Sequence, residues 1–200
     1  MTKIAVIIGS TRPGRRSRAV AEWVMEAGKR QDAVADGKAS LELVDIADYE
    51  LPLLDERLPA LFGQYENAHT KRWAAKIGSF DGFVFVTPEY NHSIPAALKN
   101  AIDYLFAEWN NKAAGFVSYG ARSGTCAVEH LRACMGELKV ADVRTQVALS
   151  LFTDFQLTNP AETGTFAPAP QHEPALHTLL EEVISWSQAL SGLRTPAAGE

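Results

Sequence analysis

The sequence has 200 residues, of which 46% are hydrophobic and 22% charged, and its formal net charge is −5 at pH 7. These values are ordinary for one globular domain with a sizeable core, and the negative charge gives no electrostatic reason to expect nucleic-acid binding. No apolar run approaches the roughly 20 residues that span a bilayer, so we expect no membrane association.

Predicted strands and helices alternate along the chain. The chain enters the first predicted strand, residues 3–8, without signal-peptide architecture, so we expect a cytoplasmic protein. Apolar runs predict the strands, and apolar residues at helical spacing predict the helices. The strands are expected at 3–8, 41–46, 83–87, 115–119 and 147–151, and the helices at about 20–27, 68–77, 95–106, 126–138 and 176–186. This alternation predicts an α/β fold, a three-layer, doubly wound, five-stranded parallel sheet.

Several segments lie outside this pattern. Residues 47–65 are expected to be irregular, and residues 158–172, rich in proline, to form an extended loop that serves as a flap or a subunit contact. We expect residues 1–193 to form a single domain and residues 194–200 a disordered tail. Cys126 and Cys134 lie eight residues apart in one predicted helix. That spacing separates them by about 12 Å, which is too far for a disulfide.

The loop after the first strand, residues 9–17, is a candidate phosphate site. It contains three arginines and three hydroxyl side chains, and it leads into a helix N-terminus, whose N–H groups favour anions. The Walker pattern fails because Arg15 and Arg16 stand where Lys and Ser or Thr are needed, and the Rossmann fingerprint fails because Thr11 replaces its second glycine. A compact mononucleotide phosphate remains. Asp45, at the end of the second strand, is either a loop residue or a ribose-binding acid.

A second polar loop follows the buried strand 83–87. Ser93 is predicted as the N-cap of the next helix, with Pro95 in the first helical turn. In an open parallel sheet ligands bind in the crevice at the carboxyl ends of the strands. We therefore expect residues 89–92 to lie in such a crevice.

Three motifs together make the chain resemble the NADPH-dependent FMN reductases of the flavodoxin-like superfamily. They are Gly9-Ser10-Thr11-Arg12, then Pro88-Glu89-Tyr90-Asn91 with Ser93-Ile94-Pro95 and Leu98-Lys99-Asn100-Ala101-Ile102-Asp103, and Ser118-Tyr119-Gly120 through Gly124. The resemblance covers about residues 3 to 150 and implies a flavodoxin-like strand order, 2-1-3-4-5.

The resemblance also implies the site residues. Ser10, Arg12 and Ser17 would bind the FMN phosphate. Pro88, Glu89, Tyr90 and Asn91 would hold the isoalloxazine and ribityl parts, and Ser118, Gly120 and Gly124 would border the ring. The sequence departs from the family at His92, Ala121 and Thr125, where many relatives have glycine.

The implied activity is hydride transfer from NADPH or NADH to FMN, and then to a small-molecule electron acceptor such as a quinone, a flavin, an azo compound or a metal ion. No acid–base side chain is needed for hydride transfer, so no catalytic residue is named. The alternatives are a flavin-binding or electron-carrier module without efficient NAD(P)H oxidation, and a relative that has lost FMN. The resemblance further implies a homodimer or homotetramer.

Three other residues keep two interpretations each. His92 is either a donor to substrate or flavin or an exposed loop histidine, Trp109 is a core or an oligomer-contact residue, and Tyr119 borders the ring or only ends a strand. The other four histidines have no metal-ligand spacing, and we expect no metal site.

Overall fold

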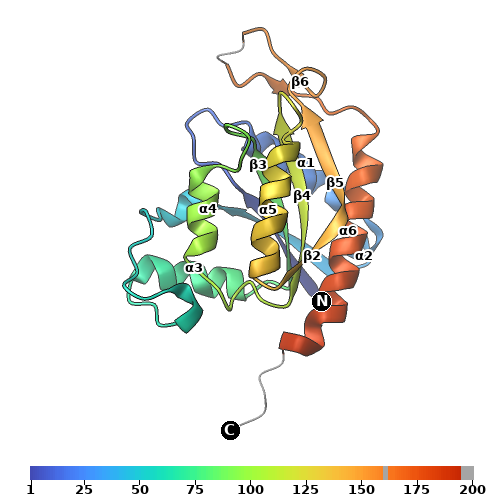
Figure 1. Cartoon of the computed structure of the whole chain (residues 1–200). Helices are drawn as coiled ribbons and strands as arrows, with labels where there is room; N and C mark the ends of the chain where they lie inside the picture. The colour runs from blue at the N-terminus through green and yellow to red at the C-terminus, as the bar shows by residue number, and fades with distance from the viewer. Residues whose placement is uncertain (160–161, 195–200) are drawn as a thin grey trace.

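The computed structural model describes residues 1–159 and 162–194. At its centre a five-stranded sheet has the order β2-β1-β3-β4-β5, and every neighbouring pair is parallel (Figure 1). The strands are β1 (Thr2–Ile8), β2 (Ala39–Asp45), β3 (Gly82–Pro88), β4 (Lys112–Gly120) and β5 (Val140–Ser150). The predicted fold class and strand order are confirmed.

Helices cover both faces of the sheet (Figure 1). The helices are α1 (Ser17–Gly28), α2 (Asp32–Ala35), α3 (Ala68–Gly78), α4 (Ala96–Asp103), α5 (Thr125–Glu137) and α6 (His172–Ala189), and the 3-10 turns are η1 (Ile46–Tyr49), η2 (Ala60–Phe62) and η3 (Leu190–Arg194). Within β3, Phe83 and Phe85 belong to the core under α3, α4 and α5, whereas Val84 and Val86 belong to the core under α1 and α6. Alternate side chains thus enter two separate cores, which explains the continuous apolar run.

Trp109 is part of the first of these cores. Its side chain is 1% exposed, its ring centroid lies 4.9 Å from that of Phe83, and its Nε1 donates a hydrogen bond to the Ile102 carbonyl at 3.1 Å. The core interpretation of this tryptophan is therefore the correct one.

The start of α4 differs from the prediction. Pro95 is the N-cap rather than a first-turn residue, with φ −58° and ψ 139°, and Ser93 forms a backbone pair with Tyr90 instead of capping the helix. The helix ends at Asp103, short of the predicted residue 106. The Ser93 backbone is held in the turn with Tyr90, and its Oγ lies 2.8 Å from His130 Nδ1 instead of accepting from the first turn of α4.

The fifth strand is longer than predicted and begins at Val140 rather than at residue 147. It is an edge strand in which buried residues such as Val143, Val147 and Leu149 are separated by half-buried and exposed ones. Its first half therefore lacks the apolar run by which the other strands were predicted.

The segment after β5 returns over the carboxyl edge of the sheet. There β6 (Phe155–Gln156) and β7 (Thr165–Phe166) form a small antiparallel pair, at the top of Figure 1. β7 lies within the stretch 158–172 that was predicted to be a loop, and α6 already begins at His172.

Both cores pack on one sheet, so we propose that residues 1–193 form a single domain. The sequence assigned Arg194 to the disordered tail, but it is the last residue of η3 and donates a hydrogen bond to the Asp81 carboxylate at 2.8 Å. The rest of the predicted tail, residues 195–200, lies outside the described part of the chain. No helix among the described residues is long and apolar enough to cross a membrane.

Candidate functional site

Three loops meet at the carboxyl edge of the sheet. They follow β1, β3 and β4 and comprise residues 9–16, 89–95 and 121–124. Because these strands are parallel neighbours, their carboxyl ends bring the loops to one edge of the sheet. All the site residues predicted from sequence lie in these loops, at the strand ends before them or at the helix starts after them.

The first loop is held close to the sheet and contains buried hydroxyl groups. A Cβ added at Gly9 would lie 3.0 Å from the Val86 carbonyl oxygen, so this backbone approach requires glycine. Ser10 and Ser17 are both fully buried, and Ser17 is the first residue of α1. The Ser17 Oγ has no hydrogen-bond partner among the described residues. An unpaired buried donor at a helix N-terminus fits a bound phosphate, which would accept its hydrogen bond.

The arginines of this loop have different partners. Arg15 and Arg18 form ion pairs with Asp45, which is 4% exposed. Asp45 is thus the counter-charge of two arginines, a role that the sequence analysis missed. The remaining cation next to Ser10 is Arg12, whose Nε donates to the Tyr90 hydroxyl at 3.3 Å. Among the three predicted loop arginines, Arg12 is therefore best placed for a ligand anion.

Arg16 connects the first loop to the segment after β6. Its Nε donates to the Thr163 carbonyl at 2.7 Å, and its guanidinium carbon lies 6.0 Å from the centre of the Phe155 ring. Thr163 in turn donates from Oγ1 to the Gly14 carbonyl at 3.3 Å. The segment that was predicted to be a flap or a subunit contact therefore packs on the first loop.

The second loop contacts the first through Tyr90. The Tyr90 hydroxyl lies 3.0 Å from Ser10 Oγ, and the Tyr90 backbone pairs with Ser93 in both directions, at 2.9 and 3.0 Å. Between them, Asn91 and His92 both have positive φ, 49° and 66°. This is the pattern of a type I′ turn, which favours Asn-Gly. The glycine that the resemblance leads us to expect in place of His92 would suit this backbone.

Glu89 connects the second loop to the start of α5, the helix that follows the third loop. Its Oε2 accepts hydrogen bonds from the backbone N–H groups of Cys126, at 3.0 Å, and Ala127, at 3.4 Å. A carboxylate from another loop therefore caps α5, which has no acidic residue in its own first turn. The resemblance implied only that Glu89 belongs to the ring-binding loop, and no local sequence signal points to this capping role.

The third loop is fixed by Ser118 and two glycines. Ser118 Oγ donates to the Ser123 carbonyl at 2.7 Å, and Gly124 has φ +71°. A Cβ at Gly124 would lie 2.9 Å from the Tyr119 nitrogen, and one at Gly120 would lie 3.3 Å from the Gly124 nitrogen. The two glycines therefore mark where the backbone of this loop passes too close to the end of β4 and to itself for a side chain.

The remaining predicted residues differ in exposure. Pro88, the last residue of β3, is buried, and Asn91 is exposed. Tyr119 is 5% exposed and packs against Phe155, with ring centroids 5.9 Å apart. The packing of Tyr119 favours its interpretation as a strand-end core residue.

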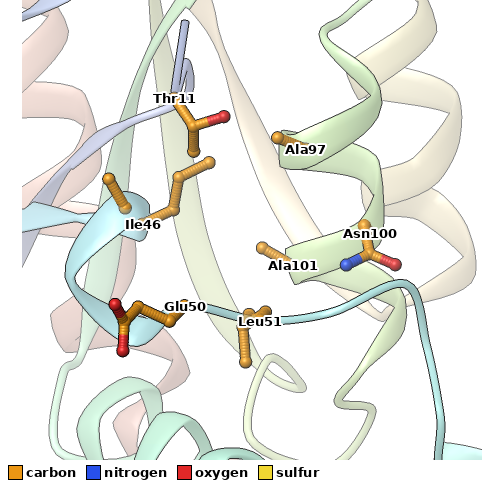
Figure 2. A pocket seen from close by; sticks show the side chains of 8 residues that line it. Thr11, Ile46, Glu50, Leu51, Ala97, Asn100 and Ala101 are labelled. Atoms are coloured by element: carbon orange, nitrogen blue, oxygen red, sulfur yellow. The ribbon is translucent and has the colours of Figure 1, made fainter. Parts of the chain in front are cut away.

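A pocket that the sequence did not predict lies beside the first loop (Figure 2). It encloses about 240 Å³ between η1 and α4, with Thr11 on one side and mainly apolar walls. Its lining residues are Thr11, Ile46, Ala47, Glu50, Leu51, Ala97, Asn100 and Ala101. Asn100 fixes one wall, because its Oδ1 accepts from the Leu54 backbone and its Nδ2 donates to the Pro52 carbonyl, at 2.9 and 2.6 Å.

A structural comparison supports the fold. The chain is similar to FerB, a flavoenzyme NAD(P)H:(acceptor) oxidoreductase from Paracoccus denitrificans, with a TM-score of 0.68 and 20% identity over 94% of this chain and 98% of that one. At this identity the likeness concerns the architecture alone.

Comparisons of sequence give the family. The chain is 43% identical over 154 residues to an NAD(P)H-dependent FMN reductase of Schizosaccharomyces pombe, covering 76% of this chain and 74% of the relative. It is 35% identical over 194 residues to an NAD(P)H-dependent FMN reductase of a Nectria species, covering 90% and 95%. Other relatives are named quinone reductases. The family model described as NADPH-dependent FMN reductase matches residues 2–154, and the chain therefore belongs to this family of oxidoreductases, whose cofactors are FMN and NAD(P)H.

Proposed function

We propose that this protein is an FMN-containing NAD(P)H oxidoreductase that works by a ping-pong sequence. One observation carries the proposal: the candidate phosphate loop and the loop after β3 contact each other through the Tyr90 hydroxyl. A single extended ligand with an anionic end and a flat ring can therefore contact both loops. Membership of the family, together with this contact, supports FMN as that ligand.

The phosphate would be held by Ser10, Arg12 and Ser17. Ser17 offers a buried hydroxyl and begins α1, whose N-terminal N–H groups face the loop side. Arg12 adds a positive charge next to Ser10. A charge-assisted hydrogen bond from Arg12 and a buried one from Ser17 are the strongest kinds that this loop offers to an anion.

The ring and the ribityl chain would lie against Pro88, Glu89, Tyr90 and Asn91, with Ser118, Gly120 and Gly124 along one border. Bound FMN supplies the redox chemistry, accepting a hydride from the nicotinamide and passing it to the acceptor. The protein's own contribution is to place backbone N–H groups where charge develops on the ring and to keep both loops rigid. The Glu89 cap and the bond from Ser118 to Ser123 supply that rigidity.

The acceptor is proposed to be a quinone, a free flavin, an azo compound or an oxidised metal ion. The names of the quinone reductases among the relatives support the first of these. Because NAD(P)H is an intracellular reductant, we propose a cytoplasmic location. We also propose a homodimer or homotetramer, which the exposed apolar side chains Leu53, Leu61 and Phe62 support, at 84%, 63% and 60% exposure.

The test is an absorbance spectrum of the purified protein with added FMN, followed by anaerobic addition of NADPH. We expect a bound-flavin spectrum that bleaches with NADPH and returns when a quinone is added. If the protein retains flavin but neither NADPH nor NADH bleaches it, the function is that of the alternative, a flavin carrier without NAD(P)H oxidation. A protein that neither retains FMN nor quenches its fluorescence would overturn the proposal.

A further inference from the structure

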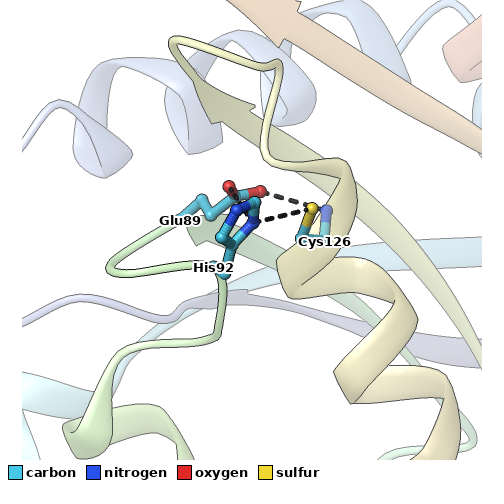
Figure 3. Close-up of side chains that lie close together, drawn as sticks. All are labelled: Glu89, His92 and Cys126. Atoms are coloured by element: carbon cyan, nitrogen blue, oxygen red, sulfur yellow. Dashed lines mark hydrogen bonds and ion pairs between the residues drawn. The ribbon is translucent and has the colours of Figure 1, made fainter.

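Three side chains with metal-binding atoms converge where the second loop meets the start of α5 (Figure 3). The carboxylate of Glu89, the imidazole of His92 and the thiol of Cys126 each offer one ligand atom, and these atoms lie within 4.8 Å of one another. His92 Nδ1 is 3.2 Å from Cys126 Sγ and 3.7 Å from Glu89 Oε1. The sequence did not predict this cluster, because His92 in the second loop and Cys126 in α5 are 34 residues apart.

Two of the three distances come close to those around a small tetrahedral ion. Bond lengths of about 2.0–2.3 Å to nitrogen, oxygen and sulfur put neighbouring ligand atoms of a zinc ion about 3.3–3.6 Å apart. The two separations measured from His92 Nδ1 lie on either side of that range. Glu89 is already oriented, because its Oε2 is held by two backbone N–H groups of α5 and its Oε1 is the atom nearer to His92.

The arrangement does not suit a nucleophilic cysteine with a histidine base. Such a triad places the thiol on one ring nitrogen and the orienting acid on the other. Here Cys126 and Glu89 both face Nδ1 of His92, as ligands of one shared ion would.

The backbone of the turn gives an independent argument. His92 has φ +66°, and a residue with a side chain in this left-handed conformation costs about 1–2 kcal/mol relative to glycine. Its side chain is 64% exposed, so apolar burial does not offset that cost. An exposed, strained histidine facing a cysteine and a glutamate indicates that the imidazole has a function of its own.

We propose that Glu89, His92 and Cys126 form a binding site for a zinc-class divalent cation, with the fourth coordination position open to solvent. Mixed sulfur, nitrogen and oxygen ligands favour zinc over magnesium or calcium, and three protein ligands with one open position are the pattern of reactive rather than structural zinc sites. The exposure of His92 provides the entry path. The inference rests on these three side chains and holds whether or not the protein oxidises NAD(P)H.

The test is calorimetric titration of the full-length, FMN-loaded protein with Zn²⁺, without NADPH and in a buffer free of chelators and thiols. We expect one equivalent to bind. His92→Gly and Cys126→Ser should each weaken binding by at least about tenfold, the scale of losing one important group at a metal site. Glycine suits the turn, so the His92→Gly variant is expected to fold at least as well as the parent protein. Cys134→Ser, on the same helix but outside the cluster, is the matched control and should bind as the parent does.

Alkylation gives a second readout in the same protein. Zn²⁺ should slow the modification of Cys126 by iodoacetamide, measured by mass spectrometry, and leave Cys134 unaffected. Replacement of Zn²⁺ by Co²⁺ should produce a thiolate charge-transfer band that Cys126→Ser abolishes. Three outcomes would each overturn the proposal: no Zn²⁺ binding by the parent protein, binding by His92→Gly and Cys126→Ser as tight as that by the parent, or equal protection of Cys126 and Cys134.

Discussion

The Tyr90 hydroxyl lies 3.0 Å from the Ser10 Oγ, although 80 residues separate the two in the chain. The same hydroxyl accepts a hydrogen bond from Arg12 Nε at 3.3 Å. Two loops at the ends of different strands are thus joined by a polar contact at one phenol oxygen. Their relative position should depend on that oxygen more than on the apolar packing of the tyrosine ring.

Replacing Tyr90 by Phe tests this dependence. The change removes both hydrogen bonds and keeps the ring, so we expect FMN affinity to fall about three- to tenfold, in line with about 1 kcal/mol for a typical hydrogen bond. Fluorescence quenching of FMN measures the affinity. Tyr49→Phe, a tyrosine change in η1, is the control and should leave it unchanged. If Tyr90→Phe binds FMN as tightly as Tyr49→Phe does, the two loops are positioned by other contacts.

Ser17→Ala should have opposite effects on the empty and the loaded protein. Without FMN, removing a buried hydroxyl that lacks a protein partner should leave the melting temperature unchanged or raise it, because an unpaired buried group costs about 1–3 kcal/mol. With FMN, the variant should lose about tenfold in affinity. Thermal unfolding with and without FMN measures both effects.

Ser187→Ala is the matched control for Ser17. Ser187 is also fully buried and without a hydrogen-bond partner among the described residues, but it lies on α6. Its replacement should have the same effect on the empty protein and none on FMN affinity. If both variants bind FMN like the parent, Ser17 is not a phosphate ligand.

Gly124 and Gly136 allow a paired test of the third loop and the helix after it. Gly124→Ala should destabilise the fold by at least about 2 kcal/mol, because the residue has φ +71° and the new methyl group would lie 2.9 Å from a backbone nitrogen. Gly136→Ala, within α5, meets nothing within 4 Å and should stabilise by about 0.5–1 kcal/mol. Urea unfolding followed by circular dichroism measures both, and a neutral Gly124→Ala would contradict the strained geometry.

Asp154 should make stability depend on pH. Burial alone would raise the pKa of this carboxyl, but hydrogen bonds from the backbone of Ala169 and Ser150 and from the Thr153 hydroxyl hold its pKa below the ordinary value. Because the pKa is lower in the folded state, the contribution of the carboxylate is present above roughly pH 4 and disappears as the pH falls through the folded-state pKa.

Asp154→Asn should therefore cost about 2–3 kcal/mol at neutral pH, since hydrogen bonds to a charged group are lost, and progressively less below about pH 4. Urea unfolding at several pH values measures the difference between variant and parent. Asp36→Asn is the control, because Asp36 is an exposed partner of Lys38 and should contribute under about 1 kcal/mol at any pH. A cost for Asp154→Asn that does not change with pH would rule out the ionised carboxylate as its source.

Much of the fold could be predicted because its inner strands are buried on both faces. Phe83 to Val86 form an unbroken apolar run for this reason, and so do Ile4 to Ile8. The first half of β5 escaped prediction because half-buried and exposed residues separate its buried ones, Val140 and Val143, so that it has neither an apolar run nor a regular alternation. The start of α4 was misplaced because the tight turn from Tyr90 to Ser93 had no signal except its unusual Asn-His pair.

The site could be predicted as a set of loops but not as a network of contacts. Motif resemblance pointed to Ser10, Tyr90 and Gly124 because each lies in a short local pattern. The pairing of Asp45 with Arg15 and the cap that Glu89 places on α5 join residues 30 and 37 positions apart. No local pattern in a single sequence specifies partners at such separations.

The match to the family model ends at residue 154, yet α6 lies beyond it and packs on one face of the sheet together with α1. Gly115 of β4 shows how closely the helix approaches, since a Cβ there would lie 2.8 Å from the Leu179 side chain. A chain shortened to the matched region would leave apolar side chains of β4 and β5 on that face, among them Val117, Val143 and Val147, in contact with water. The boundary that sequence comparison draws is therefore not one at which this protein can be cut for expression.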